Sequence, residues 1–528
     1  MPTLVKRALL LLAAFALLLT SLYGCTGGTE IGESDPVTAQ SGELPAQSDA
    51  PGGEPEGNSV TVGIAQDIAS LDPHLATTAG TREVMFNLFE GLVKASPEGG
   101  VANAVASDYE VSPDGLTYTF TLREGVTFHN GEQVTVQDVL YSLERCAGSE
   151  NDGVPLISAF SVVDAIEADE EGHVILTLAA PSLEFINSVA SASIIPANSG
   201  PTIAEDPIGT GPFQFVSYSP KDSIVIEKYD GYWGGTAHLD QVTFRIIEDM
   251  NNMIMGLQGG TLDLVIHLTS SYLPSVRDDF TVLNDTMKLV QALYINNAVE
   301  PFNDVRVRQA MYYAIDVDEL NEFVCDGTGV ATGTSMYPAQ RQYFMPELAK
   351  AYPHDVEKAR ELLAQAGYPD GFAFTITVPS NYDPHVQTAE VMAEQLKEVG
   401  ITATVQPVEW ETWYNDVYKG REFETSVCGV SASDMTAREM LERYTSDAGK
   451  NFINFSNGEF DRVVAQAKAT LDAGEQMTLY KRAEEILSEE AASLWTMDLG
   501  ELVVMNPALD GFTFYCTYVL DMSTLYYK

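Results

Sequence analysis

Residues 107–145 read SDYEVSPDGLTYTFTLREGVTFHNGEQVTVQDVLYSLER and carry clear signals for a turn, a strand and a helix. Apolar residues and threonine alternate strictly over residues 116–122, which predicts a half-buried strand. The preceding SPDG at 112–115 suits a tight turn, so a hairpin is expected. Helical spacing follows over residues 136–145. This order predicts mixed α and β structure.

Similar patterns recur along the rest of the chain. Short strands are expected at residues 60–65, 174–178, 224–228 and 242–247. Helices are expected at residues 305–324, 356–366, 459–471 and 475–490, and Asp355 and Gly367 suit the two ends of the second. A strand at 372–378, a helix at 385–399 and a strand at 401–408 predict a parallel strand pair. The second half is therefore expected to be an α/β lobe, and the first to be richer in strands and turns.

The first 58 residues predict an exported, lipid-anchored protein. Lys6 and Arg7 precede an apolar run over residues 8–19, and LYGC follows at 22–25. The run is too short to cross a bilayer as a mature helix but suits a secretory signal. A lipoprotein signal peptide over residues 1–24, with cleavage before Cys25 and lipidation of that residue, is therefore expected; ordinary signal cleavage is the alternative. Residues 25–58 are rich in Gly, Pro, Ser and acidic residues, which predicts a disordered linker.

Length and charge limit the possible functions. The 470 residues from 59 to 528 exceed the size of a single core, so two or three lobes are expected. Lys and Arg number 28 against 76 Asp and Glu, and loss of Lys6 and Arg7 moves the net charge from −48 to −50. Nucleic acid is an improbable partner, because phosphate binding requires a basic surface. So acidic a surface keeps an exported protein soluble; steering of cationic ligands is the alternative.

The sequence contains no motif for a metal site or a common catalytic site. Cys146, Cys325, Cys428 and Cys516 are far apart without CxxC spacing, and either one or two disulfides or free thiols remain open. The seven histidines are scattered, and neither a nucleophile elbow nor a nucleotide fingerprint occurs. No cofactor or metal is expected. A glycosidase with two distant acids stays possible, so a lipid-anchored extracellular hydrolase is the alternative function, and a surface adhesin is a third.

Blocks spread over nearly the whole mature chain carry a family resemblance. The blocks occur in order: SLDPH at 70–74, NLFEGLV at 87–93, PIGTGPF at 207–213, GGTLDLV at 259–265, PFNDVRVRQAMYYAID at 301–316, DVEKARELLAQAGYPDGF at 355–372, and FSNGEFD at 455–461. Together with residues 101–145 they resemble the extracellular solute-binding proteins of family 5, the peptide, nickel and oligosaccharide receptors of ABC importers. Seven blocks in register make a coincidence negligible.

The resemblance implies an α/β, two-lobed periplasmic-binding-protein-like fold of type II, with an extra subdomain in lobe one. Lobe one would span residues 59–290, including an inserted subdomain at 78–205, and be completed by residues 503–528. Lobe two would span residues 291–502. A solute would bind in the cleft between the lobes, and the loaded protein, a monomer at the extracytoplasmic face of the cell membrane, would dock on permease subunits. The resemblance implies a receptor rather than an enzyme.

The resemblance also suggests where a ligand binds. Peptide-binding members carry a Gly-Trp-x-Ala-Asp segment in lobe two, whose aspartate pairs with the α-amino group of a peptide. Here residues 429–434 read GVSASD, so Gly429, Val430, Ser431, Ser433 and Asp434 are expected at the ligand. Either Asp434 captures an amine, or it is a solvated or helix-capping acid.

Further ligand contacts are expected at Thr77, Thr78, Trp410 and Trp495. Trp413 is a weaker candidate, because large aromatic residues most often pack in a core. His385 is expected to be structural rather than a metal ligand. The identity of the ligand, whether peptide, nickel complex or oligosaccharide, stays open.

Two smaller predictions concern local structure. GTGP at 209–212 lacks the later glycine and the lysine of a phosphate-binding loop, so a plain backbone turn is expected. Arg306 and Arg308 lie near the start of a helix, where the helix dipole disfavours cations. They are therefore expected to pair with carboxylates.

Overall fold

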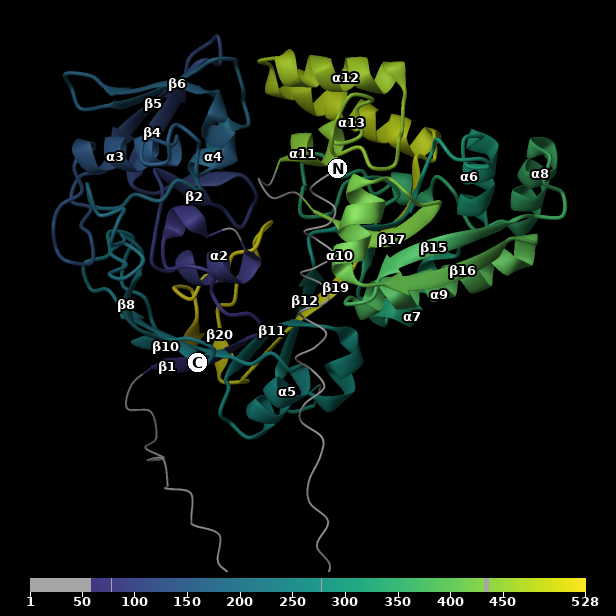
Figure 1. Ribbon diagram of the computed structural model, residues 1–528. Coiled ribbons are helices and arrows are strands. Elements are labelled where there is room, and N and C mark those ends of the chain that lie inside the picture. Colours follow the sequence, from purple (N-terminus) through teal and green to yellow (C-terminus); the bar gives the residue numbers. More distant parts are fainter. Residues whose placement is uncertain (1–57, 77, 277, 432–435) are drawn as a thin grey trace, which may run out of the picture. The chain divides into compact units, whose positions relative to one another are not determined.

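Two large β-sheets and one small sheet carry most of the secondary structure in a computed structural model of the protein (Figure 1). The structure describes residues 58–528 apart from 77, 277 and 432–435. The predicted signal peptide, Cys25 and almost all of the linker therefore lie outside the described residues. Within the described part, no helix is both long and apolar enough to span a membrane. We call the part built on the seven-stranded sheet lobe one, and the part built on the six-stranded sheet lobe two.

The seven-stranded sheet of lobe one is mixed. Its central strand β1 pairs in parallel with β10 and with β11, while the outer pairs are antiparallel. In sheet order the strands are β12 (Thr281–Thr286), β19 (Gly500–Met505), β11 (Leu264–Leu268), β1 (Ser59–Ile64), β10 (Gln241–Ile246), β9 (Ser223–Lys228) and β8 (Phe213–Ser219). The strands predicted at 60–65, 224–228 and 242–247 are confirmed. Helix α5 (Met250–Gln258) and the 3-10 helices η1 (Pro73–Leu75) and η3 (Ser270–Ser275) belong to the same lobe.

A four-stranded antiparallel sheet forms the additional part of lobe one. Its strands, in sheet order, are β4 (Ala106–Val111), β5 (Thr117–Leu122), β7 (Val174–Leu178) and β6 (Val163–Ala168). The predicted hairpin is confirmed, because the Gly115 N–H donates to the Ser112 carbonyl at 2.8 Å and Gly115 has a φ of +66°. The sheet lies beside α3 (Val136–Cys146) and α4 (Phe185–Val189) (Figure 1). Shorter elements are β2 (Val93–Ala95), β3 (Val101–Asn103) and the 3-10 helix η2 (Ser158–Val162).

The hydrophobic core of this part is separate from that of the seven-stranded sheet. It includes buried side chains from Leu92 to Ile194. Helix α2 (Ala79–Met85) falls within the predicted subdomain at 78–205, yet its residues Val84 and Met85 pack in the core of the seven-stranded sheet. By core packing, the separate unit therefore begins later than residue 78.

Lobe two contains the predicted strand-helix-strand unit. β15 (Ala373–Pro379) and β16 (Thr402–Val408) pair in parallel over seven residues, and α9 (Asp383–Leu396) with the 3-10 helix η5 (Lys397–Val399) connects them. The sheet order is β14 (Val330–Ala331), β18 (Ser493–Asp498), β13 (Val290–Ile295), β17 (Thr425–Val430), β15 and β16. The remaining helices are α6 (Val305–Tyr313), α7 (Val317–Cys325), η4 (Leu348–Lys350), α8 (Val356–Ala366), α10 (Trp410–Thr412), the π-helix η6 (Trp413–Lys419), α11 (Ala437–Glu442), α12 (Gly458–Ala469) and α13 (Ala473–Glu489).

The single helix predicted at residues 305–324 is wrong, because two helices occupy this stretch. α6 ends at Tyr313, and α7 begins after Asp316. The Asp316 carboxylate accepts a hydrogen bond from the Glu319 N–H at 3.0 Å and so caps a new helix. By contrast, α8 is confirmed at both ends, with Asp355 as its N-cap and Gly367 in the left-handed conformation after its last turn.

Two antiparallel strands pass from one large sheet to the other. β12 continues into β13 through residues 287–289, and β18 continues into β19 through Leu499. The two crossings lie side by side, since the Met287 N–H donates to the Leu499 carbonyl at 2.9 Å. Gly500 to Leu502 already belong to the seven-stranded sheet, so the second crossing precedes the lobe boundary predicted at 502.

Several local predictions can be checked directly. Cys146, Cys325, Cys428 and Cys516 are free thiols in the structure. Arg306 pairs with Asp304 at 2.5 Å, as expected. The Arg308 guanidinium instead donates chiefly to backbone carbonyls, and its nearest carboxylate oxygen is 3.7 Å away on Glu490.

The predicted turn at 209–212 lies against another segment of backbone. An added Cβ at Gly209 would come within 2.0 Å of the Leu88 carbonyl oxygen, so only glycine fits there. The motif therefore has a packing role.

Candidate functional site

Lobe two offers a candidate site at the carboxyl ends of β15, β16 and β17. The chain moves from β15 to β16 through α9, then returns past β15 to β17 through α10 and η6. Right-handed crossovers in these opposite directions place α9 and η6 on opposite faces of the sheet. Such a reversal leaves a crevice outside the carboxyl ends of the strands, where ligand sites form in open α/β sheets.

Trp410 lies at this edge, directly after β16. It is 45% exposed and stacks on Trp413 at 5.2 Å between ring centroids, while Tyr382 meets it edge-on at 5.9 Å. Trp413 is only 5% exposed, and its Nε1 donates to the Ser426 hydroxyl at 2.9 Å. The sequence interpretation of Trp413 as a core residue is confirmed, whereas Trp410 is accessible.

Gly429 and Val430 end β17 at the same edge, and Ser431 follows them. Ser433 and Asp434, like Thr77, lie outside the described residues. The chain is described again at Thr436, whose side chain caps α11 by accepting from the Glu439 N–H at 3.2 Å. The structure thus brings Trp410 and the first three residues of the predicted segment 429–434 to one edge.

His385 is enclosed beside this edge. Its Nδ1 lies 2.9 Å from the Gln291 side-chain oxygen. Burial lowers the pKa of His385 to about 4, so the ring is neutral at neutral pH. This environment agrees with a structural role, and no cluster of metal-ligating side chains occurs in the described part of the chain.

Trp495 does not share the exposed edge. It lies in β18 with no exposed surface, and its ring meets Tyr294 at 5.7 Å and Tyr444 at 5.5 Å, both edge-on. The expectation that its side chain contacts a ligand therefore disagrees with the structure, which places it in the core of lobe two. Periodicity on a strand does not reveal which face of a fully buried sheet lies near a cleft.

Helix α2 and the residue before it carry polar side chains on the lobe-one side of the candidate site. Thr78, exposed, precedes the helix, and its hydroxyl lies 2.7 Å from that of Thr81. The Arg82 Nε donates to the Ala76 carbonyl at 3.1 Å. Burial lowers the pKa of Arg82, and the charge of Glu439 in lobe two opposes this effect. A charge on α2 is therefore within electrostatic reach of lobe two.

Three cavities adjoin one another at the C-terminal segment 516–519. Thr517 lines all three, and Tyr518 lines two of them. Sequence reasoning did not identify these residues, because nothing local in an aromatic-rich tail indicates that it returns to the cleft. Beyond this segment, Leu520, Met522 and Leu525 pack in the core of the seven-stranded sheet.

The interlobe cavity takes its walls from both lobes and has a volume of about 100 Å³. The exposed side chain of Arg341 contributes a positive charge to the wall of this cavity. The lining residues from lobe one are Ser96, Glu98, Gly99, Gly100, Glu184, Asn187, Cys516 and Thr517, and those from lobe two are Ala339, Gln340, Arg341, Gln342, Tyr343, Thr436 and Ala437. Thr436 and Ala437, at the start of α11, bring this helix to the cavity wall.

A charged cluster lines the small third cavity, next to the crossing strands. His267 lies between two carboxylates, at 2.7 Å from Glu83 and in a shorter contact with Glu501. Burial alone would lower the pKa of His267, but the charges of Glu83 and Glu501 raise it well above its ordinary value. Lys288 then joins Glu501 at 3.2 Å and Asp285 at 2.7 Å. The cluster links α2 to both crossing strands.

Asp498 lies at the crossing itself. It is fully buried, and one carboxyl oxygen accepts from the Leu289 N–H at 3.1 Å. The other oxygen has no hydrogen-bond partner within the described part of the chain. Burial raises the pKa of Asp498 to about 8, so its neutral form dominates at pH 7.

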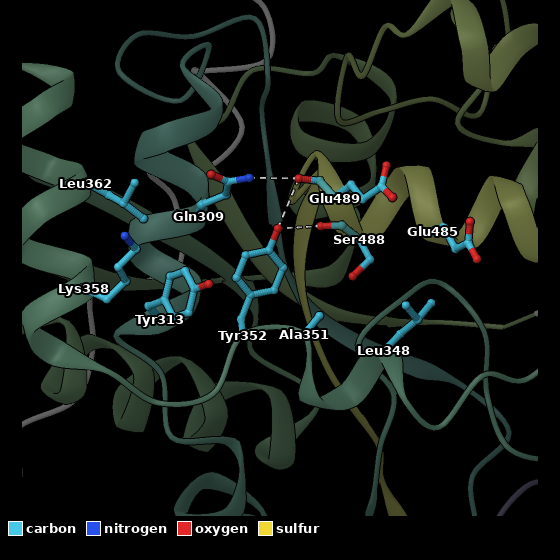
Figure 2. A pocket seen from close by; sticks show the side chains of 10 residues that line it. All are labelled: Gln309, Tyr313, Leu348, Ala351, Tyr352, Lys358, Leu362, Glu485, Ser488 and Glu489. Carbon is cyan, nitrogen blue, oxygen red and sulfur yellow. Dashed lines mark hydrogen bonds between the residues drawn. The ribbon is translucent and has the colours of Figure 1, made fainter.

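Figure 2 shows a wider groove, of about 580 Å³, elsewhere in lobe two. Tyr352 and Gln309 donate there to backbone carbonyls at the end of α13. Arg482 pairs with the Glu485 and Glu489 carboxylates. None of the residues that line this groove lines the three cavities around Thr517, so it is separate from the candidate site.

Comparison with known proteins agrees with this architecture. The family model for bacterial extracellular solute-binding proteins, family 5 Middle, matches residues 100–452. The glutathione-binding protein GsiB of Pectobacterium atrosepticum is 30% identical over 448 residues, covering 81% of this chain and 86% of that protein.

Solved structures have the same fold. The ABC transporter substrate binding protein CtaP from Listeria monocytogenes gives a TM-score of 0.80 at 22% identity, over 89% of this chain and 99% of that chain. DppA from Helicobacter pylori, in complex with the peptide STSA, gives 0.69 at 25% identity, over 89% and 98%. The expected α/β, two-lobed periplasmic-binding-protein-like fold is confirmed.

Proposed function

This chain belongs to the bacterial extracellular solute-binding proteins of family 5, and from that membership we propose that it is the receptor of an ABC importer for short peptides and peptide-like solutes. In this proposal the solute is held noncovalently between the lobes and passed unaltered to permease subunits. One observation carries the proposal: a cavity lined by both lobes adjoins a larger one in lobe one at Thr517. Ligand sites favour such interfaces between domains.

The proposed solute carries at least one carboxylate. Arg341 lines the interlobe cavity, in a chain that has only 28 Lys and Arg against 76 Asp and Glu. Guanidinium groups suit carboxylate recognition because they offer paired donors. The name of the Pectobacterium relative and the peptide held by the Helicobacter protein point to the same class. Glutathione and short peptides are therefore the first solutes to test.

The proposal assigns Thr78, Trp410 and residues 429–431 to the solute contacts, together with Thr77, Ser433 and Asp434, which lie outside the described residues. Solute binding would favour a closed arrangement of the lobes only to the extent that it binds that arrangement more tightly. The crossing strands at residues 287–289 and 499 supply the hinge in this mechanism.

We also propose that residues 1–24 are a lipoprotein signal peptide and that Cys25 carries the lipid anchor at the extracytoplasmic face of the membrane. Incorporation of labelled palmitate into the full chain in bacterial cells, and its loss in Cys25→Ser, is the expected outcome. Labelling that persists in Cys25→Ser would contradict this anchor.

Calorimetric titration of the purified full chain tests the receptor proposal. Glutathione and tri-alanine are the proposed ligands, and a nickel-histidine complex and maltotriose are the comparators. A ligand at one hundred times its Kd stabilises the folded state by about 2.7 kcal/mol, so a melting shift should accompany binding. Arg341→Gln should weaken binding about 10-fold or more, because a hydrogen bond to a charged group contributes roughly 1.5–3 kcal/mol.

Arg306→Gln is the matched control, since Arg306 pairs with Asp304 on the surface of lobe two and lines none of the three cavities. It should leave affinity unchanged. Absence of binding to both peptides would contradict the peptide proposal. Hydrolysis of maltotriose or of a peptide by the pure protein would instead favour the hydrolase alternative.

A further inference from the structure

The lobe-one cavity is the largest of the three that adjoin Thr517, with a volume of about 320 Å³. We infer that it is a side-chain pocket that selects solutes carrying a bulky apolar group, aliphatic or aromatic. The inference rests on the proposed function, because it requires a solute seated at Thr517. It adds the chemical class of one part of that solute.

Apolar side chains reach the cavity from several directions. Met85, Phe86 and Phe89 come from α2 and the turn after it, and Met85 and Phe89 are each 4% exposed. Leu156 and Ile157 come from the segment before η2. An apolar group in contact with these side chains would lose water over that part of its surface, and burial of a Leu or Phe side chain gains free energy.

Charged groups in the walls already have partners within the protein, as Arg82 does through the Ala76 carbonyl and Glu90 through three donors. The Glu90 carboxylate accepts from Lys94 at 2.9 Å and from Tyr232 and Trp233 at 2.7 Å each. It is 3% exposed, and its three donors occupy both oxygens. A cationic solute group entering here would lose its water without gaining this carboxylate.

His74 is engaged in the same way. Its Nε2 lies 2.8 Å from the Ser193 carbonyl oxygen, and its Nδ1 lies 2.7 Å from the Arg145 guanidinium. These contacts suit a neutral ring that donates through Nε2 and accepts through Nδ1. Burial lowers the pKa of His74 to about 4, which agrees with this state. An acidic solute group would therefore find no cation at His74.

The cavity is reachable from solvent and from the interlobe cavity. Ser158 and Ser191 line it and are exposed. Thr517 lines both this cavity and the interlobe cavity. A solute whose backbone lies between the lobes at Thr517 therefore has a path along which one side chain enters lobe one.

Calorimetric titration of the full chain with a tripeptide series tests the assignment. The probes are tri-alanine and the tripeptides in which one alanine at a time is replaced by Phe, Leu, Glu or Lys. At one position, Phe and Leu should bind about 10- to 100-fold more tightly than Ala, by the free energy of burying such side chains. Glu and Lys at that position should bind no more tightly than Ala.

Ala159→Trp should fill the cavity, since Ala159 lines it and is half-buried. This variant should abolish the preference for Phe and Leu while tri-alanine still binds. If the tryptophan variant fails to fold, Leu156→Ser, at another half-buried wall residue, provides the second test. This variant should reduce the preference for Phe and Leu. Ala168→Trp, at an exposed residue at the end of β6, is the matched control and should change nothing.

The outcomes separate the two proposals. Equal affinity for the whole series, or a preference for Glu or Lys, overturns the apolar pocket while the receptor function stands. An undiminished preference in both Ala159→Trp and Leu156→Ser overturns this location for the pocket. Failure of every tripeptide to bind overturns the peptide receptor and the pocket with it.

Discussion

Asp498→Asn should stabilise the protein at neutral pH and remove part of its pH dependence. The carboxyl group is fully buried between the two crossing strands, and one of its oxygens has no hydrogen-bond partner among the described residues. Burial raises its pKa to about 8, and hydrogen bonding from Thr286 and Leu289 opposes this only in part. An unfolded chain would titrate this group near pH 4.

The sign follows from proton binding. Between about pH 4 and pH 8 the folded state keeps the proton that the unfolded state loses, so the unfolding free energy falls as pH rises. Each pH unit corresponds to about 1.4 kcal/mol, and three units separate pH 4 from pH 7. Asp498 therefore costs the protein up to about 4 kcal/mol at pH 7, relative to pH 4. A neutral asparagine of the same shape avoids this cost.

Urea unfolding of both proteins at pH 4.5, 5.5, 6.5 and 7.5 measures the effect. The difference in unfolding free energy between Asp498→Asn and the parent should grow by about 1.4 kcal/mol per pH unit in favour of the variant. Asp370→Asn, at an exposed carboxylate, controls for a general change of charge and should give a flat difference. A difference for Asp498→Asn that stays constant with pH would refute the argument from burial.

Three further substitutions test other parts of the structure. Glu484→Met should stabilise the protein by about 1–3 kcal/mol at pH 7, as measured by urea unfolding. Glu484 is fully buried, and neither of its carboxyl oxygens has a hydrogen-bond partner among the described residues. Burial also raises the pKa of Glu484 well above its ordinary value. Gly209→Ala should destabilise it by about 1–3 kcal/mol, since the new Cβ would lie 2.0 Å from the Leu88 carbonyl oxygen. His267→Gln should lower the melting temperature, because it removes the cation between Glu83 and Glu501, whose side chains are only 5% and 7% exposed. An unchanged melting temperature would contradict a stabilising role for this ion cluster.

Elements with complete local signals were predictable from the sequence. Helix α8 has an aspartate cap, a regular apolar face and a glycine at its end, and both of its ends agree with the prediction. The strand predicted at 116–122 alternates strictly, and β5 occupies almost the same residues. The helix predicted at 305–324 failed because an apolar face continues through Ala314, although Asp316 offers the backbone a new cap. Local pattern and capping competed there, and capping decided the structure.

The site was only partly predictable, because it depends on contacts between distant segments. Trp410 and residues 429–431 were found through their place in the family register, and the parallel strands then bring them to one edge. Trp495 came from the same register, but every residue of β18 is buried, so the pattern of this strand does not distinguish a core side chain from a cleft side chain. Thr517 was missed, since only the folded chain brings the tail back to α2 and to the interlobe cavity.

Helix α2 connects the candidate solute pocket to the hinge. One side of it supplies Arg82, Met85 and the turn at Phe86 to the lobe-one cavity. The adjacent residue Glu83 contacts His267, which contacts Glu501 on the crossing strand, and Lys288 on the other crossing completes the chain of ion pairs. Lys288 has a φ of +56°, a conformation that is rare for a residue with a side chain and that marks local strain. These ion pairs therefore form a continuous series of contacts from α2, which lines the cavity, to a strained residue of the crossing strands.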